Sequence, residues 1–163
     1  MDDDIEARVR AAAEATDVAF EVFACDPALA DTAAFCEAYG FAMEDSANCV
    51  VVKGKSDPPV FVACVVLATT RLDVNGVVRR RIGTRKASFA GADEVQELTD
   101  MSIGGVTPPG LPAGMALWVD ARVMERERIV LGGGSRACKI LAPPALLTAL
   151  GGEAVADLAV PVT

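Results

Sequence analysis

The 163-residue chain contains no histidine. This absence excludes the Ser-His-Asp and Cys-His forms of nucleophilic catalysis, and it excludes the zinc sites that use histidine ligands. Any catalysis here has to use backbone dipoles, carboxylates, lysine, hydroxyl groups or the substrate itself. We expect neither a metal site nor a cofactor.

Long apolar runs and paired cysteines are also missing. No apolar run approaches the roughly 20 residues that span a bilayer, and the acidic start MDDDIEARVRAAAEATD resembles neither a signal peptide nor a transit peptide. We therefore expect a cytoplasmic protein. No two cysteines form a CxxC pair, so we predict buried thiols rather than disulfides or a zinc site. The cysteines are Cys25, Cys36, Cys49, Cys64 and Cys138.

Negative charge predominates, with a formal net charge of −8. This negative net charge argues against electrostatic binding of duplex nucleic acid over a broad surface, and we expect no DNA partner. One segment, RRRIGTRK at 79–86, nevertheless holds five of the 15 basic residues. It is either a solvated helix end and turn or a local phosphate contact. Its basic residues are Arg79, Arg80, Arg81, Arg85 and Lys86.

The order of expected elements predicts an α+β fold with a mixed sheet in a single domain, residues 1–163. Hairpin-like pairs of strands alternate with single helices, which is unlike a regular parallel α/β fold. Helices are expected at 4–15, 32–40, 71–83 (capped by Asp73 and stopped by Gly83), 92–100 and 143–152. Strands are expected at 18–25, 48–54, 58–68, 86–90, 115–120, 128–134, 138–142 and 154–160.

The connection SIGGVTPPGLPAG (102–114) places glycines beside prolines. Gly104 and Gly105 allow another group to approach the backbone, while Pro108 fixes its own φ and keeps Thr107 extended. Such a loop, which includes Val106, can present rigid amide groups to an oxygen that becomes negative during acyl transfer. The alternative is a plain helix-to-strand connection.

Two further segments have a functional and a structural interpretation. In LGGGSRACK (131–139), Gly133, Gly134, Ser135 and Arg136 form either an anion-binding nest or a tight hairpin. The spacing matches neither a phosphate-binding loop nor a dinucleotide fingerprint. Lys53 lies near the end of NCVVVKG. It either contacts substrate or keeps its ammonium in solvent while the aliphatic part of its side chain packs on the protein.

Taken in order, these segments resemble the YbaK family of prolyl-tRNA-editing domains, from about Phe23 to Leu158. The resemblance rests on TAAFCEAYG, NCVVVKG, the stretch RLDVNGVVRRRIGTRKASFAGADEVQELTDMSIGGVTPPGLP, WVD, LGGGSRACKI and AVADL. It implies a mixed sheet curled into a barrel-like core with helices outside. It also implies hydrolysis of the ester that joins a wrong amino acid to tRNA.

The resemblance implies that the backbone of the GxxxP loop, Gly104 to Pro108, holds the aminoacyl carbonyl and shapes the side-chain pocket. It also implies that the substrate ribose hydroxyl and a bound water replace a side-chain base. Members with editing activity carry a lysine in a K-[TS]-L pattern at the start of a strand, and here Asn48 and Cys49 take the first two positions. Asn48 can donate a hydrogen bond but supplies no charge, and Lys53 and Arg136 are the candidates for a cation from elsewhere. The departure implies either a branch with a different amino-acid preference or a weak or inactive member.

Two functions remain open at this point. The first is a free-standing aminoacyl-tRNA deacylase, whose partners are the acceptor end of tRNA and, as a second candidate, an aminoacyl-tRNA synthetase. The second is a binding module that keeps the fold without the chemistry and holds a tRNA end, a small ligand or a protein. The substitution at Asn48 motivates the second.

Overall fold

The computed structural model describes residues 2–162, and the side chains of residues 3–162. The helices are α1 Asp2–Glu14, η1 Pro27–Leu29, α2 Thr32–Tyr39, η2 Met43–Asp45, η3 Val74–Val78, α3 Arg79–Ile82, α4 Ala92–Thr99, α5 Ala121–Met124 and α6 Ala145–Ala149. The strands are β1 Glu21–Ala24, β2 Ala47–Gly54, β3 Val60–Leu67, β4 Thr70–Leu72, β5 Ala87–Phe89, β6 Ala116–Asp120, β7 Ile129–Gly132, β8 Cys138–Ala142, β9 Glu153–Val155 and β10 Ala159–Pro161.

The largest sheet is mixed, with strand order β5-β2-β3-β6-β9. β2 and β3 form a long antiparallel hairpin in which Ala47 lies opposite Leu67, and β5 adds to β2 in the antiparallel sense. β6 pairs with β3, and β9 pairs with β6, in the parallel sense. The predicted α+β class and mixed sheet are therefore confirmed.

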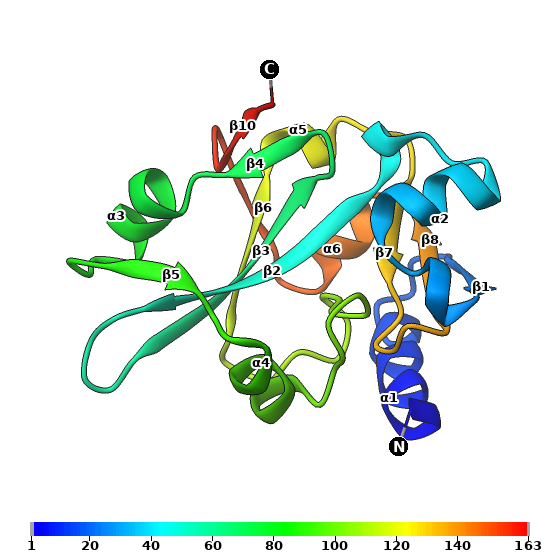
Figure 1. Ribbon diagram of the computed structural model, residues 1–163, viewed down its shortest axis with the longest axis horizontal. Coiled ribbons are helices and arrows are strands. Elements are labelled where there is room, and N and C mark those ends of the chain that lie inside the picture. The colour runs from blue at the N-terminus through cyan, green and yellow to red at the C-terminus, as the bar shows by residue number, and fades with distance from the viewer. Residues whose placement is uncertain (1, 163) are drawn as a thin grey trace.

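The expected barrel-like closure is not present in the described residues. Their strands form three sheets: the five-stranded one, an antiparallel sheet β1-β8-β7, and the pair β10-β4. A single parallel bridge, Ser46 to Val130, links the larger sheet to the three-stranded one. One bridge does not continue the ladder of hydrogen bonds, so the two sheets stand side by side (Figure 1).

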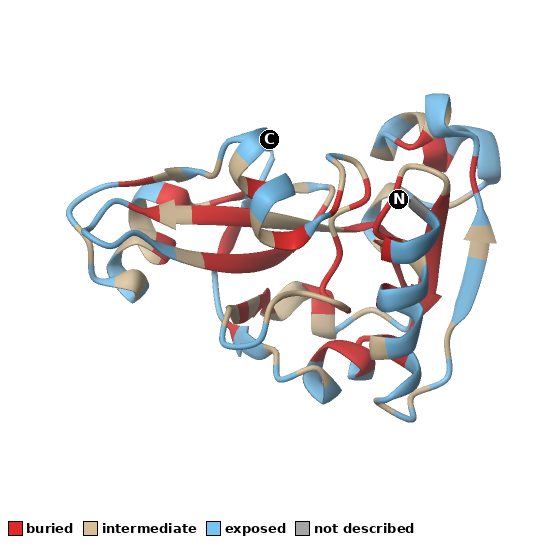
Figure 2. Cartoon of the chain, turned by 90° about the horizontal axis from the view of Figure 1, so that it is seen from below, coloured by how far each residue is buried: buried red, intermediate tan, exposed pale blue. Residues whose placement is uncertain are grey.

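Both faces of the five-stranded sheet are covered, which explains why β3 is apolar throughout. Ala63, Val65 and Leu67 pack into a cluster with residues of α1, α6 and the three-stranded sheet. The alternate residues of β3 pack on the other face with η3, β4 and β10: Val62, Cys64 and Val66. Buried residues accordingly run along the central strands, while the outer faces of the helices are exposed (Figure 2).

The segment predicted as a helix over 71–83 contains the end of strand β4, followed by the helical elements η3 and α3. Residues up to Leu72 form β4, because they pair with β10 and Leu72 lies opposite Ala159. Helical structure begins after Asp73, whose carboxylate accepts from the amides of Gly76 and Val77. It ends at Gly83, where φ is 86°, so the predicted cap and stop are both confirmed.

The last expected strand, 154–160, is two elements. Asp157 adopts a left-handed conformation, with φ of 57°, and separates β9 from β10. The turn sends the two strands into different sheets, since β9 pairs with β6 and β10 with β4. Among the described residues, no helix has the length and apolarity needed to cross a membrane.

Replacing Asp73 with Ala removes the acceptor of two amides at distances of 3.1 and 3.2 Å. We expect a loss of about 1–2 kcal/mol in the free energy of unfolding, measured by urea denaturation. Asp93→Ala is the matched control, because Asp93 lies exposed in the first turn of α4. It should cost about 0.5 kcal/mol or less. Equal losses in the two variants would contradict the capping role.

Candidate functional site

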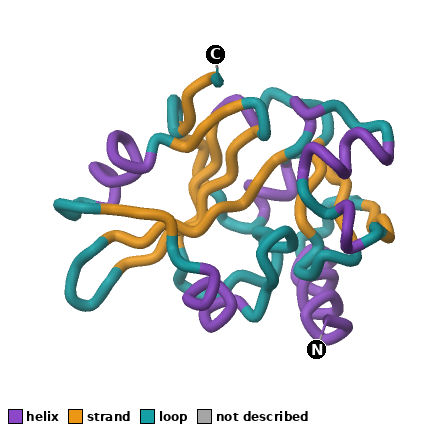
Figure 3. Tube along the Cα trace, viewed as in Figure 1, coloured by secondary structure: helices purple, strands orange, loops and turns teal. Residues whose placement is uncertain are grey.

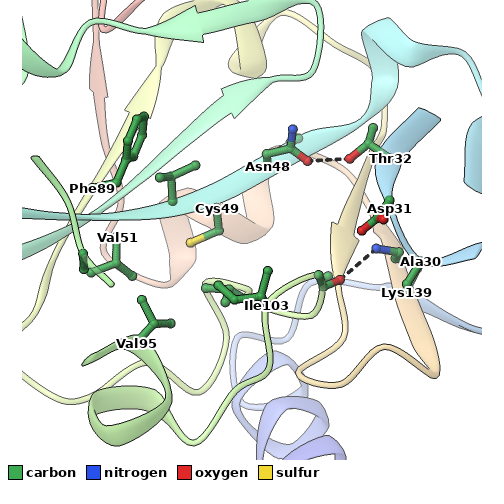
Figure 4. A pocket seen from close by; sticks show the side chains of 16 residues that line it. Ala30, Asp31, Thr32, Asn48, Cys49, Val51, Phe89, Val95, Ile103 and Lys139 are labelled. Carbon is green, nitrogen blue, oxygen red and sulfur yellow. Dashed lines mark hydrogen bonds between the residues drawn. The ribbon is translucent and has the colours of Figure 1, made fainter. Parts of the chain in front are cut away.

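A cavity of about 360 Å³ lies between β2, the loop after α4, and the three-stranded sheet (Figure 4). The loop is the long irregular segment that joins α4 to β6 (Figure 3). One part of the cavity wall is apolar and the other carries polar groups. The lining residues are Ala30, Asp31, Thr32, Ala47, Asn48, Cys49, Val50, Val51, Phe89, Ala90, Val95, Ile103, Gly104, Val106, Gly132 and Lys139.

Residues 102–114 of this connection, here called the Gly/Pro loop, contain amides without a hydrogen-bond acceptor in the described part of the chain as well as amides that donate within the protein. Gly104 and Val106 line the cavity, and within residues 2–162 their N–H groups donate to no protein acceptor. The N–H of Gly105 instead donates to the carbonyl of Ser102 at 2.8 Å. Thr107 and Pro108 are buried and do not line the cavity, so they anchor the loop from behind.

The two glycine-rich segments cross in backbone-to-backbone contact. A Cβ on Gly105 would lie 2.5 Å from the carbonyl oxygen of Ser135, and one on Gly132 would lie 2.7 Å from that of Val106. The amide of Gly134 donates to the carbonyl of Gly105 at 2.6 Å. Glycine is required at this crossing because any side chain would push the two backbones apart.

Residues 133–137 join β7 to β8, which pair in the antiparallel sense, so the hairpin interpretation of residues 131–139 is confirmed. Gly133, Gly134 and Ser135 do not line the cavity. Ser135 is fully buried and its hydroxyl donates to Glu6 of α1 at 2.8 Å. These three residues therefore support the Gly/Pro loop from the side away from the cavity.

Arg136 fastens the Gly/Pro loop to the segment before α2. Its Nε donates to the carbonyl of Pro27 at 3.1 Å. One terminal nitrogen donates to Asp31 at 3.1 Å and to the carbonyl of Ile103 at 3.3 Å. The guanidinium is thus committed to protein acceptors, and Arg136 does not line the cavity.

Lys53 is similarly engaged. Its Nζ lies 2.7 Å from Oε2 of Glu94, a contact that joins β2 to α4. The pKa of Glu94 is lowered, mainly by this hydrogen bond from Lys53 and further by the amide of Gly91. Lys53 does not line the cavity, so neither cation proposed from the sequence points its charge into the site.

Asn48 lies on the cavity wall at the start of β2. Its Oδ1 accepts a hydrogen bond from the hydroxyl of Thr32 at 3.0 Å (Figure 4). The carboxamide nitrogen of Asn48 donates to no acceptor within residues 2–162. Asn48 is therefore oriented by α2 and keeps two N–H donors for another group.

Sequence reasoning missed Lys139, which lines the cavity from β8. The residue is only 7% exposed, and its Nζ donates to the carbonyl of Gly104 at 3.1 Å. Its ammonium lies 5.6 Å from the centre of the Phe35 ring. Burial lowers the pKa of Lys139 below the usual value for lysine. The available signal was a lysine inside the apolar strand CKILA, where a charge is unusual.

The family comparison covers this whole site. A model of the aminoacyl-tRNA editing domain matches residues 26–149, which is most of the chain. The chain belongs to the aminoacyl-tRNA editing domain family. The matched range includes Asn48, the Gly/Pro loop and Lys139, and it leaves α1 outside.

Solved structures share the fold of this editing domain. One is described provisionally as a trans-editing enzyme for prolyl tRNA synthetase: TM-score 0.82, 22% identity, with 97% of each chain covered. Another is the hypothetical protein APE2540: TM-score 0.83, 24% identity, with 93% of this chain and 99% of that chain covered. At these identities the similarity establishes the fold.

The editing domain offers no activated thiol in its cavity. Cys49 lines the wall, but burial raises the pKa of its thiol far above the ordinary value, so the thiolate is not formed at neutral pH. The five cysteines are free. Within the described residues, no three His, Cys, Asp or Glu side chains are grouped to hold a metal ion.

The basic segment of the editing domain is partly committed to the fold. Arg79 donates to the carbonyls of Asn75 and Thr84. Arg81 pairs with Glu153 and lies over the ring of Trp118 at 4.8 Å. Three exposed residues remain without a side-chain partner in the described part of the chain: Arg80, Arg85 and Lys86.

Replacing Gly105 with Ala forces a Cβ against the backbone of Ser135. We expect a loss of about 1–3 kcal/mol in unfolding free energy and shifted amide resonances for Gly104 and Val106. Thermal unfolding and ¹H–¹⁵N spectra measure the two effects.

Gly91→Ala is the matched control, since a Cβ there meets only Glu94 Oε1, at 3.5 Å. It should cost less than about 1 kcal/mol and leave the loop resonances in place. Unchanged stability and an unchanged loop spectrum in Gly105→Ala would show that the two segments do not pack as described.

Proposed function

We propose that this editing-domain protein is a free-standing deacylase that hydrolyses the ester of a mischarged aminoacyl-tRNA. The observation that carries the proposal is the pair of unengaged amides, at Gly104 and Val106, on the wall of the cavity. Oriented N–H dipoles of this kind stabilise the oxyanion formed when water adds to an ester. The description of one structural neighbour as a trans-editing enzyme supports the same activity.

The apolar part of the cavity suits a small aminoacyl side chain. Cys49, Val51 and Val95 form this part, and the titratable thiol among them stays neutral. A charged amino acid would lose its hydration there without finding a partner. We therefore expect substrates such as alanyl, cysteinyl or seryl esters rather than aspartyl or lysyl ones.

The rim of the cavity suits the terminal nucleotide. Phe89 is 58% exposed and Ile103 is 56% exposed, and both line the cavity. An exposed aromatic ring provides a surface on which a nucleobase stacks. With the base against Phe89, the exposed Lys86 and Arg85 precede β5 and offer cations to the acceptor-strand phosphates.

The reaction needs no side-chain base in this arrangement. Asp31, the carboxylate of the cavity wall, accepts from Arg136, and Cys49 is a neutral thiol. A bound water adds to the ester carbonyl carbon and gives a tetrahedral oxyanion held by the two amides. The carbon–oxygen bond to the ribose then breaks. The neighbouring ribose hydroxyl relays the proton from the water to the departing ribose oxygen, and the free amino acid leaves.

The alternative function is a binding module that has lost catalysis. Its support is Asn48, which, by the resemblance described above, takes the position of the lysine of editing-active members. The cavity is the same in both proposals, so the two differ in turnover rather than in the place of binding. A cytoplasmic location, where charged tRNA is found, fits both.

The purified protein should release the amino acid from at least one of Ala-tRNA, Cys-tRNA and Ser-tRNA. We expect a rate at least 100-fold above spontaneous hydrolysis, because a single oxyanion donor contributes about 10²–10³-fold. Scintillation counting of the labelled amino acid measures the release. Asp-tRNA and Lys-tRNA serve as charged controls and should remain intact.

Asn48→Lys separates the enzyme from the binding module. If the wild type hydrolyses an ester and Asn48→Lys slows this hydrolysis, the wild-type site with Asn48 is catalytically active. If the wild type releases nothing from any tRNA and Asn48→Lys gains hydrolysis, the protein is a binding module and the proposal fails.

A further inference from the structure

Lys139 is a buried cation that the fold does not neutralise. It lies on the central strand of the β1-β8-β7 sheet and is 7% exposed. No carboxylate within the described residues forms an ion pair with it. Burying an ammonium without a carboxylate partner costs several kcal/mol. The Phe35 ring, 5.6 Å from Nζ, and the carbonyl of Gly104 offset this cost only in part.

The groups that face Lys139 leave its charge uncompensated. Asp31, ahead of α2, is the nearest carboxylate in electrostatic terms, but it is exposed and bound to Arg136. Arg136 itself repels the ammonium. Cys25 after β1 and Cys138 on β8 are thiols whose pKa is raised, chiefly by burial, so they stay neutral.

The ammonium contacts the loop that carries the unengaged amides. Lys139 Nζ donates one hydrogen to the carbonyl of Gly104, the residue that carries one of those amides. An ammonium has three donors, and the other two have no acceptor within residues 2–162. Lys139 is also the one cationic residue on the described cavity wall, since Lys53 and Arg136 lie outside it.

We propose that Lys139 is a catalytic residue whose ammonium, together with the amides of Gly104 and Val106, binds the ester carbonyl oxygen as it becomes negative. The role rests on the proposed deacylase function. The catalytic role explains why the protein buries the charge of Lys139. A buried cation that is already oriented toward an oxyanion interacts with that oxyanion more strongly than a solvated cation does.

The geometry connects positions 139 and 48. Both Lys139 and Asn48 line a small side cavity of about 20 Å³ that adjoins the main one. A lysine at position 48 would therefore place its charge in the same recess from the β2 side. The proposed reaction needs one cation in this recess, and a lysine on either β2 or β8 can supply it.

Lys139→Met removes the charge and keeps an unbranched side chain that is one atom shorter. We expect kcat/KM for ester hydrolysis to fall by about 10²–10³-fold, about tenfold of this through weaker substrate binding and the rest through kcat. The melting temperature should stay the same or rise, because the burial cost disappears. Adding Asn48→Lys to this variant should recover at least tenfold of the rate. The same Asn48→Lys change in the wild type should slow it, since two ammonium groups then share one recess.

A lower melting temperature with unchanged kcat would assign Lys139 a structural role and overturn the proposal. Failure of Asn48→Lys to recover any rate in a folded Lys139→Met protein would overturn it as well. Arg8→Met, which removes an exposed cation paired with Asp100, is the control for general charge effects and should leave kcat unchanged.

Binding of a stable substrate analogue separates this proposal from the deacylase function. The probe is 3′-alanylamino-3′-deoxyadenosine, followed by titration calorimetry and by the ¹³Cε resonance of Lys139. If no tRNA ester is hydrolysed but the analogue binds and Lys139→Met weakens binding at least tenfold, the deacylase function fails and the role of Lys139 as the oxygen-binding cation stands. Equal binding by both proteins, or no binding to the wild type, overturns the role of Lys139.

Discussion

The site depends on one close contact, the crossing of the Gly/Pro loop and the β7–β8 connection without intervening side chains. The amide of Gly134 reaches the carbonyl of Gly105, and the absent Cβ of Gly105 leaves room for the backbone of Ser135. Because this contact fixes one peptide of the loop from behind, the neighbouring peptides are free to face the cavity. Glu6 of α1 holds Ser135 in turn, so α1 supports the same crossing.

The cations around the Gly/Pro loop divide into those that hold it and the one, Lys139, that lines the cavity in the described part of the chain. Arg136 donates to the carbonyl of Ile103 and Lys53 pairs with Glu94, so these cations position the loop and α4. Lys139 instead binds the carbonyl of Gly104 from inside the cavity. In a chain without histidine, one cation and two residues with unengaged amides thus line a cavity whose wall also has an apolar part and the polar residues Asp31, Thr32 and Asn48. This arrangement favours an oxygen atom that gains negative charge.

Local sequence patterns predicted much of this architecture and only part of the site. The mixed sheet, the Asp73 cap and the Gly83 stop follow from residues close together in the chain, and so does the glycine–proline loop. The partners of Lys53 and Arg136 lie 41 and 105 residues away, so no local pattern revealed that these charges are engaged. The apolar neighbours of Lys139 predict a buried strand, and its contact with Gly104, 35 residues away, leaves no local pattern that would place it in the site. The barrel was expected from family resemblance, and a single bridge between Ser46 and Val130 does not close one.

The most direct test is a crystal structure of the protein with an unreactive aminoacyl-adenosine analogue bound. The account predicts that the acyl oxygen lies within hydrogen-bond distance of the amides of Gly104 and Val106 and of Lys139 Nζ, with the amino-acid side chain toward Val51. An analogue bound elsewhere, or one whose acyl oxygen contacts none of these three donors, would contradict it.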